Sequence, residues 1–189
     1  MARHVLVTGA LGCIGSWVVR NLVREGTPVF AFDLAADPHR LRLLMNEKEL
    51  EQARIIQGDI TDLEGLIGAM ATHNITDIIH LAALQVPACK ADPPLGARVN
   101  VVGTVNVFEA ARHLGLSRVV YASSVAAYGP SEEYERSLLT HDDPLKPRTL
   151  YGTYKQANET TARVYWWDHG LSSIGLRPYV TYAPSSLSR

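Results

Sequence analysis

The chain has 189 residues and a formal net charge of −1; 47% of its residues are hydrophobic and 20% are charged. This length and composition fit one globular domain with a substantial core, taken here as residues 1–189. The balanced charge gives no indication of a nucleic-acid or membrane surface, and no apolar run approaches the ~20 residues of a membrane-spanning helix. Because no signal sequence precedes the first predicted strand, we expect a cytoplasmic protein. Cys13 and Cys89 lack a metal-type spacing, so we expect unpaired, reduced thiols and no metal.

Three glycines, Gly9, Gly12 and Gly15, form a Gly-x-x-Gly-x-x-Gly turn near the N-terminus. The turn lies between an apolar run over residues 5–7 and an amphipathic segment, which predicts a strand, a tight turn and a helix start. Glycine suits a turn that takes positive φ or lets a ligand contact the backbone. The helix N–H groups and dipole favour an anion, so the turn is a candidate pyrophosphate site, with a merely tight turn as the alternative. The apolar face of this helix is formed by Ile14, Val18, Val19, Leu22 and Val23.

A second β-type run over residues 28–32 ends at Asp33. An acid about 20 residues after the glycine turn is where a Rossmann fold binds the adenosine ribose, although a strand-end aspartate can also simply cap a turn. A carboxylate at this point repels a 2′-phosphate, so the sequence favours NAD over NADP. Arg40 and Arg42 follow nearby and have a simpler interpretation as solvated helix residues.

The rest of the chain alternates helix and strand patterns. We expect helices at 38–50, from Thr61 or Asp62 to 71, at 95–114 and at 149–169, and strands at 54–57, 77–83, 118–122 and 172–177. Gly170 suits the C-cap of the last helix. This alternation predicts a doubly wound parallel sheet of the Rossmann type in three α/β/α layers.

Between these elements lie segments with less regular patterns. Prolines at 87, 93 and 94 predict a loop, and the acidic stretch 131–143 either covers a site or lies in solvent. His80 fits a buried strand-end residue better than a base. Asn100 is a poor helix former inside a predicted helix, which indicates a side-chain partner that the sequence does not identify.

Tyr151 and Lys155 are four residues apart in a predicted helix and therefore share one face. A free tyrosine has a pKa of ~10; a neighbouring ammonium or a cationic nicotinamide favours the phenolate, which can then act as a base. Ser124 follows the strand at 118–122, at the edge where open α/β sheets bind ligands, and its hydroxyl can hold a substrate oxygen. Tyr128 and Tyr154 are simpler to interpret as core aromatics.

These motifs together resemble those of the extended short-chain dehydrogenase/reductase family, in its NAD-dependent epimerase/dehydratase group. The matching segments cover nearly the whole chain: residues 8–15, 58–60, 80–83, 100–104, 123–129, 151–155 and 176–178. The resemblance implies a catalytic triad of Ser124, Tyr151 and Lys155, with Lys155 also holding the nicotinamide ribose. It also implies a cofactor site formed by Gly9, Gly12, Cys13, Ile14, Gly15, Asp33, Asp59, Ile60, Leu81, Ala82, Ala83, Tyr151 and Lys155. In this site Asp33 would bind the ribose, Asp59 and Ile60 would lie near adenine, and Ala82 and Ala83 would lie along the pyrophosphate and nicotinamide side.

The sequence departs from the resembled family at two places. The 4,6-dehydratases of the family carry an Asp-Glu pair where Val125 and Ala126 stand here, so a dehydratase of that type is disfavoured. Family members also continue past the point where this chain stops, with a last strand and a small C-terminal substrate domain. We therefore expect that domain to be largely absent, in a fragment or a minimal form.

The expected function is that of an NAD-dependent oxidoreductase. Its hydride transfer would act at a secondary alcohol or ketone of a sugar, sugar acid or nucleotide-sugar, as an epimerase or a dehydrogenase. The alternative is an NAD-binding module without turnover. The last helix carries more apolar surface than one sheet face requires, from Ala157, Ala162, Val164, Tyr165 and Trp166, and in the resembled family it lies in a two-fold interface. We expect a homodimer on this basis, with Trp166 and Trp167 in packing or interface roles.

Overall fold

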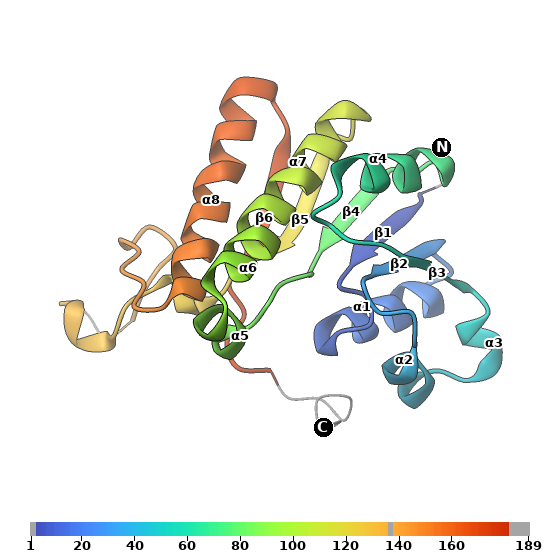
Figure 1. Ribbon diagram of the computed structural model, residues 1–189, viewed down its shortest axis with the longest axis horizontal. Helices are drawn as coiled ribbons and strands as arrows, with labels where there is room; N and C mark the ends of the chain where they lie inside the picture. Colours follow the sequence, from blue (N-terminus) through green and yellow to red (C-terminus); the bar gives the residue numbers. More distant parts are fainter. Residues whose placement is uncertain (1–2, 136–137, 182–189) are drawn as a thin grey trace.

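The computed structural model describes residues 3–135 and 138–181, and its centre is a six-stranded parallel sheet with the order β3-β2-β1-β4-β5-β6 (Figure 1). The strands are β1 (Val5–Thr8), β2 (Val29–Asp33), β3 (Ala53–Gln57), β4 (Asp77–His80), β5 (Arg118–Ala122) and β6 (Ser172–Leu176). The strand order reverses between β1 and β4. The predicted doubly wound, Rossmann-type sheet is therefore confirmed, and this reversal is where such sheets bind ligands.

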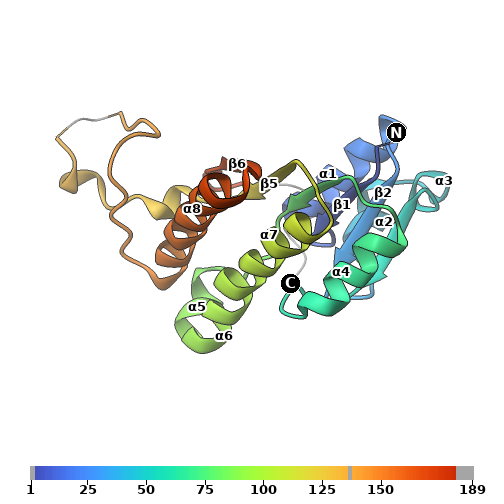
Figure 2. The ribbon, with the colours of Figure 1, turned by 90° about the horizontal axis from the view of Figure 1, so that it is seen from above.

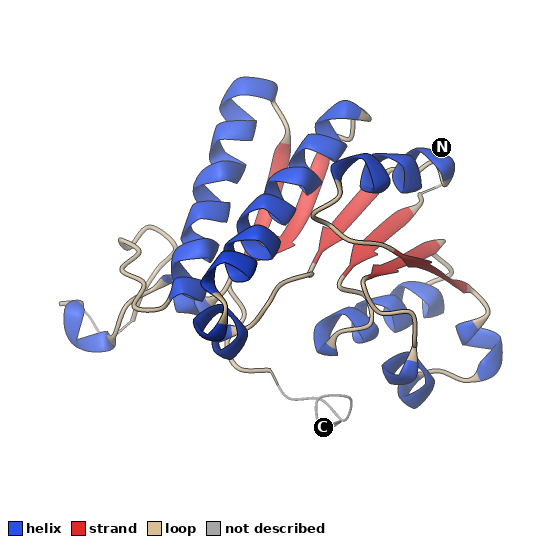
Figure 3. Ribbon diagram, viewed as in Figure 1, coloured by secondary structure: helices blue, strands red, loops and turns tan. Residues whose placement is uncertain are grey.

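Helices cover both faces of the sheet, as the views in Figures 2 and 3 show. On one face, α1 (Cys13–Arg24) packs against β1 and β2 and is flanked by α2 (His39–Leu44) and α3 (Glu47–Leu50). On the other face lie α4 (Leu63–Thr72), α7 (Gly103–His113) and α8 (Leu150–His169). No helix within residues 3–135 and 138–181 is long and apolar enough to cross a membrane.

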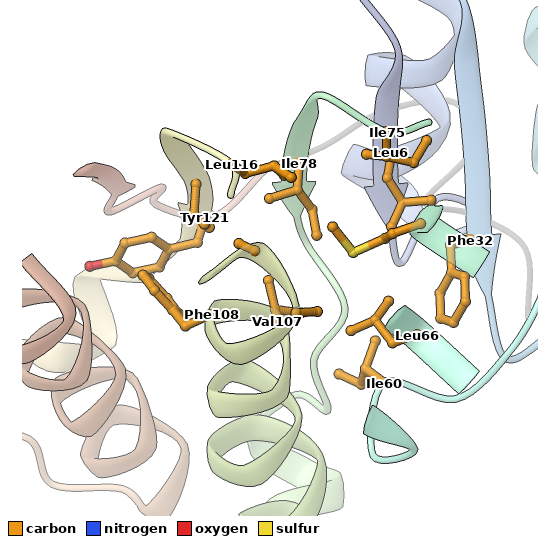
Figure 4. Packing of buried hydrophobic residues seen from close by; sticks show 14 of the residues in the cluster. Leu6, Phe32, Ile60, Leu66, Ile75, Ile78, Val107, Phe108, Leu116 and Tyr121 are labelled. Carbon is orange, nitrogen blue, oxygen red and sulfur yellow. The ribbon is translucent and has the colours of Figure 1, made fainter. Parts of the chain in front are cut away.

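Alternate residues of the strands feed two cores, because successive strand side chains point to opposite faces. Leu6 and Ile78 face α4 and α7, where Leu66 and Phe108 complete the larger core (Figure 4). The second core joins β1 and β2 to the first two helices through Val5, Val7, Val29, Ala31, Val19, Leu22 and Leu41. Fully burying one such side chain contributes about 1.5–3 kcal/mol.

The two ends of the sheet are covered to different degrees. All residues of β1 are buried, whereas β6 has no buried residue. A Cβ added at Gly175 would lie 2.5 Å from the Tyr121 hydroxyl, so a side chain at this position would clash with Tyr121. Ile174 and Leu176 alternate with Gly175 and are 48% and 58% exposed. On the side of α1, the described residues therefore leave Ile174 and Leu176 of β6 exposed.

The predicted helix at 38–50 is wrong as a single element. Its two parts, α2 and α3, are separated by Met45, which has an extended backbone, and by Asn46. The Asn46 side chain accepts a hydrogen bond from the Glu49 N–H, and the Glu49 carboxylate accepts one from the Asn46 N–H. This capping box starts a new helix where periodicity alone indicated continuation.

The proline-rich segment before residue 95 is helical, not a loop. It forms α5 (Val86–Ala91) and α6 (Pro93–Ala97), each with proline in the first turn, where its missing N–H costs no hydrogen bond. The chain continues through a π-helical turn, η1 (Arg98–Val102), into α7. Elsewhere Asp62, not Thr61, caps α4, and Gly170 ends α8 in the predicted left-handed conformation.

Candidate functional site

The glycine turn joins β1 to α1 at the carboxyl edge of the sheet. Gly9 has φ +65°, and an added Cβ would lie 2.6 Å from the Ala82 backbone nitrogen. A Cβ at Gly15 would lie 2.1 Å from the Gly9 carbonyl oxygen. These two glycines are thus required by close backbone packing within the protein itself. Gly12 is the N-cap residue of α1, and no side chain of the described residues caps this helix, so its first N–H groups suit an anion.

Cys13 and Ile14 form the first turn of α1, beside the predicted pyrophosphate site. Cys13 is half-buried, and its carbonyl oxygen accepts a hydrogen bond from the Ser16 hydroxyl at 3.0 Å. Ile14 is exposed rather than packed on the apolar face of the helix. The apolar side chains of α1 that pack in the core therefore begin at Val18 rather than at Ile14.

Asp33 ends β2 and ties it to the glycine turn. Its Oδ2 atom accepts a hydrogen bond from the Leu11 N–H at 2.9 Å, and Oδ1 accepts one from the Ala35 N–H at 3.0 Å. Each carboxylate oxygen can accept a further hydrogen bond, as ribose hydroxyls would require. Arg40 is not simply solvated, because it is half-buried and donates to the Leu11 carbonyl at 3.3 Å, whereas exposed Arg42 pairs with Asp37.

The segments after β3 and β4 complete this edge of the sheet. Leu81 donates its N–H to the Thr8 carbonyl at 3.1 Å, and the following residues Ala82 and Ala83 are half-buried beside the glycine turn. The strand predicted over 77–83 ends at His80, so these residues lie in the loop that follows it. Asp59 is exposed and accepts the Thr61 N–H at 2.8 Å.

Ile60 belongs to the hydrophobic core rather than to an open surface. It is buried against Gly103, and its carbonyl accepts a hydrogen bond from the Asn106 amide at 2.9 Å. His80 is buried too, as predicted for a strand-end residue. Its ring nitrogens contact the hydroxyls of Thr8 and Thr104 at 2.7 and 3.0 Å, and burial lowers the pKa of His80 to about 3.

Ser124, Tyr151 and Lys155 come together at the carboxyl end of β5. The Ser124 hydroxyl accepts the Ala126 N–H at 3.1 Å and thereby caps the short helix η2 (Val125–Ala127). Tyr151 and Lys155 lie on successive turns of α8, 8% and 3% exposed. The Lys155 Nζ atom is 5.6 Å from the Tyr151 ring centre and donates to the Ala122 carbonyl at 2.7 Å. Tyr154 points elsewhere and donates to the Pro93 carbonyl at 3.0 Å.

Burial dominates the acid–base properties of this group of residues. It raises the pKa of Tyr151, and a hydrogen bond with Ser124 lowers that pKa in part. Burial also lowers the pKa of Lys155 to about 8. In the chain by itself the pKa of Tyr151 is therefore raised rather than lowered, because desolvation of the phenolate is the largest effect.

The π-helical turn explains why Asn100 stands inside a helix. Its side chain accepts the Leu84 N–H at 2.7 Å and donates to the Leu84 carbonyl at 2.9 Å, so it holds the loop after β4. Its own carbonyl accepts a hydrogen bond from the Asn158 amide at 2.9 Å. Such turns expose backbone groups and are frequent at functional sites.

Cys89 lies in α5 next to this turn, not in a loop. It is buried, and its Sγ atom is 3.4 Å from the Asn100 amide nitrogen. Burial raises the pKa of the Cys89 thiol. Both cysteines are free, as predicted.

The polar network beside these residues joins Ser123, Glu159 and Arg177, and the sequence did not predict it. Ser123 and Arg177 lie in the matching segments 123–129 and 176–178, but neither segment indicated this contact. The exposed face of α8 is also smaller than predicted: Ala162 lies in the core, whereas Val164 and Trp166 are exposed.

Known proteins of one family resemble the chain along nearly its whole length. A model described as the NAD dependent epimerase/dehydratase family matches residues 5–189. The UDP-glucose 4-epimerase of Mycolicibacterium smegmatis is 35% identical over 183 residues, which cover 96% of this chain and 57% of that protein. The UDP-glucuronate 4-epimerase of Thermodesulfobacterium geofontis is 32% identical over 188 residues, covering 96% and 57%.

Solved structures of similar proteins share the fold of this chain. L-threonine dehydrogenase from Clostridium difficile superposes with a TM-score of 0.81 at 27% identity, covering 93% of this chain and 53% of that one. UDP-glucose 4-epimerase from Brucella ovis, solved in complex with NAD, has a TM-score of 0.80 at 28% identity, covering 93% and 51%. The chain thus spans just over half the length of these relatives. On this family match, with the sheet order and glycine turn described above, the chain belongs to the NAD dependent epimerase/dehydratase family, and its cofactor is NAD.

Proposed function

We propose that this chain carries the cofactor-binding and acid–base machinery of an NAD-dependent epimerase or dehydrogenase. The reaction is hydride transfer at a secondary alcohol or ketone of a sugar, sugar acid or nucleotide-sugar. The observation that carries the proposal is the shared position of Ser124, Tyr151 and Lys155, buried together at the same sheet edge as the glycine turn. A protein that only binds a nucleotide needs none of these three side chains.

The described residues fit NAD. The uncapped start of α1 suits the pyrophosphate, and Asp33 has acceptor capacity left for the adenosine ribose. The Lys155 ammonium has three N–H donors; one reaches Ala122, which leaves donors for the nicotinamide ribose. When bound, NAD supplies the hydride acceptor or donor. The adenine end is assigned to Asp59 and Ile60, and the nicotinamide side to Ala82 and Ala83.

Tyr151 is the proposed acid–base group, and Ser124 orients the substrate oxygen. In oxidation, Tyr151 as phenolate takes the proton from the substrate hydroxyl; in reduction it returns that proton. Ser124 assists because its hydrogen bond lowers the pKa of Tyr151. Lys155, whose pKa is about 8, is an ammonium at neutral pH and stabilises the phenolate and the bound ribose. At residues 125 and 126, Val and Ala supply no second acid or base, which disfavours elimination of water.

The substrate class is inferred from the relatives. Sequence relatives are named as UDP-glucose and UDP-glucuronate epimerases, and a protein of the same fold is named as an L-threonine dehydrogenase, so sugar nucleotides and a smaller alcohol are the substrate classes proposed here. This chain spans just over half of their length. An NAD-binding module without turnover is the second candidate.

One experiment separates the two candidates. NADH formation and epimerisation are measured over a panel of sugars, sugar acids and nucleotide-sugars, with Tyr151→Phe, Lys155→Met and Tyr154→Phe as variants. General acid–base catalysis contributes 10²–10⁴-fold, so Tyr151→Phe should lower the rate by about that factor and leave NAD affinity nearly unchanged. Lys155→Met should weaken both, whereas Tyr154→Phe should keep activity because the Tyr154 hydroxyl donates to the Pro93 carbonyl rather than to a residue of the proposed site.

Each result has a clear meaning. A wild-type chain that binds NAD but turns over nothing on the panel supports the binding module. An active chain that is indifferent to Tyr151→Phe contradicts the assignment of the acid–base group.

Assembly is a separate proposal. The exposed face of α8 is lined by Thr153, Ala157, Thr160 and Val164, and two copies could pack there as a homodimer. A monomeric mass in light scattering at tens of micromolar would contradict it.

A further inference from the structure

A half-buried ion pair between Arg177 and Glu159 lies next to the proposed active site. The Arg177 guanidinium donates from Nε to the Glu159 Oε1 atom at 2.8 Å and from Nη2 to Oε2 at 2.6 Å. Both side chains are less than one-fifth exposed. The Ser123 hydroxyl donates to the same carboxylate, and Ser123 is itself buried. Two-point pairing of this kind is strong and fixes geometry.

The three residues come from three separate elements. Ser123 follows β5 and immediately precedes Ser124; Glu159 is one turn beyond Lys155 on α8; and Arg177 follows β6. The carboxylate of Glu159 therefore connects the segment that carries the proposed substrate-orienting hydroxyl to the helix that carries the tyrosine and lysine.

The surroundings of Arg177 restrict the same region further. Its guanidinium stacks over the Tyr128 ring at 4.6 Å and donates to the Tyr128 hydroxyl. The next residue, Pro178, accepts the Val125 N–H at 3.2 Å, which holds the turn after Ser124. The end of β6 thus contacts the Ser124 turn through both side chain and backbone.

We propose that Glu159 is a positioning residue: held by Arg177, its carboxylate fixes Ser123 and so keeps the Ser124 hydroxyl against Tyr151. The catalytic consequence of this role rests on the proposed function; the geometric role does not. If the ion pair only stabilised the fold, its loss would lower the unfolding temperature without changing the environment of Tyr151 in molecules that remain folded.

The test uses the tyrosine ring as a reporter that needs no turnover. The full chain is labelled with [¹³Cζ]tyrosine, whose resonance responds to hydrogen bonding of the hydroxyl, and the Tyr151 signal is assigned with Tyr151→Phe. Spectra at neutral pH then compare wild type with Ser123→Ala and with Glu159→Gln. Ser123→Ala removes only the hydroxyl that reaches Glu159 and leaves the Arg177 pair in place, so it remains informative even if Glu159→Gln fails to fold.

The matched control is Glu109→Gln. Glu109 also pairs with an arginine, Arg112 at 2.8 Å, and accepts a tyrosine hydroxyl, that of Tyr165 at 2.6 Å. It makes no contact with Ser123. The control should move the Tyr165 resonance and leave that of Tyr151 unchanged. Among the groups that face Tyr151, Ser124, Cys89 and Lys155 are unaltered in every variant.

The expected result is a shifted or broadened Tyr151 resonance in Ser123→Ala and Glu159→Gln. On an active chain, kcat should fall about tenfold, as for the loss of one oriented hydrogen bond, with KM for NAD unchanged. An unchanged Tyr151 resonance in folded Ser123→Ala would overturn the proposal. If the resonance moves but wild type shows no turnover, the positioning role stands and only the proposed function fails.

Discussion

The two halves of the sheet are held together by different kinds of interaction. Around β1 and β2, nearly every strand residue is buried apolar surface, and the glycine turn fits because backbone atoms pack closely. Around β5 and β6, polar contacts hold the elements together. Lys155 donates a hydrogen bond to the Ala122 carbonyl, Glu159 forms an ion pair with Arg177, and the Asn158 amide donates to the Asn100 carbonyl. The comparison indicates that the cofactor half is shaped by local packing, whereas the catalytic half is shaped by hydrogen bonds between distant segments.

Glycine-to-alanine variants should give the largest effects and test whether the two halves of the sheet are separable. A Cβ at Gly15 would meet the Gly9 carbonyl, and one at Gly152 would lie 2.0 Å from the Ala126 carbonyl. Backbone atoms cannot move aside easily, so each variant should lose roughly 3 kcal/mol or more of stability. At temperatures where both are folded, Gly15→Ala should lose NAD binding in calorimetry, whereas Gly152→Ala should keep it and lose turnover.

The control for these variants is Gly68→Ala. Apart from the backbone of α4 itself and the two neighbouring residues, no atom of the described residues lies within 4 Å of a Cβ built at Gly68, so this variant should gain up to about 1 kcal/mol from helix propensity. If Gly152→Ala removed NAD binding as Gly15→Ala does, the two halves would not be separable.

Two leucine-to-alanine variants should measure the difference in packing between β1 and β6. Leu6 on β1 is fully buried, and Leu176 on β6 is 58% exposed. Leu6→Ala should cost about 3 kcal/mol in urea unfolding, because it removes buried methyl groups and leaves a cavity. Leu176→Ala should cost less than about 0.5 kcal/mol, as surface changes do. A cost at Leu176 equal to that at Leu6 would mean that β6 is buried in solution.

His80 lies between the halves and should make stability depend on pH. Its folded pKa of about 3 is below the unfolded value of 6.5, so the unfolded chain binds the extra proton. This contribution is therefore complete above pH 6.5 and is lost as the pH falls, by about 1.4 kcal/mol per unit where only the unfolded form is protonated. Urea unfolding at pH 7.5 and 5.5 measures the change. His80→Gln, which keeps polar atoms near Thr8 and Thr104, should show a smaller change in the free energy of unfolding between these two pH values.

The smallest expected effect concerns cofactor choice in the first half. Asp33 should favour NAD over NADP, because a 2′-phosphate would meet its carboxylate. Asp33→Asn should narrow that preference by about tenfold, or 1.4 kcal/mol, in parallel calorimetric titrations. Equal or tighter binding of NADP by the wild-type chain would contradict the assignment of Asp33 to the ribose.

The sequence by itself determined the features that depend on nearby residues. Strand and helix periodicity predicted all six strands, and the three glycines predicted the turn between β1 and α1. The four-residue spacing of Tyr151 and Lys155 sets them on one helix face in any α-helix, because its period is 3.6 residues. Gly170 was also predictable, since a left-handed C-cap needs only glycine at that position.

Only the tertiary structure decided which distant groups meet. Asn100 was recognisable as an exception within a helix, but its partners come from the β4 loop and, 58 residues away, from Asn158. Ser123 and Glu159 are 36 residues apart. No local pattern selects such pairs, because their contact depends on how strands are ordered in the sheet and how helices lie on it. Desolvation is decided in the same way: the pKa of Tyr151 follows from how deeply α8 is buried against the sheet, which neither the spacing nor the identity of its neighbours in sequence can fix.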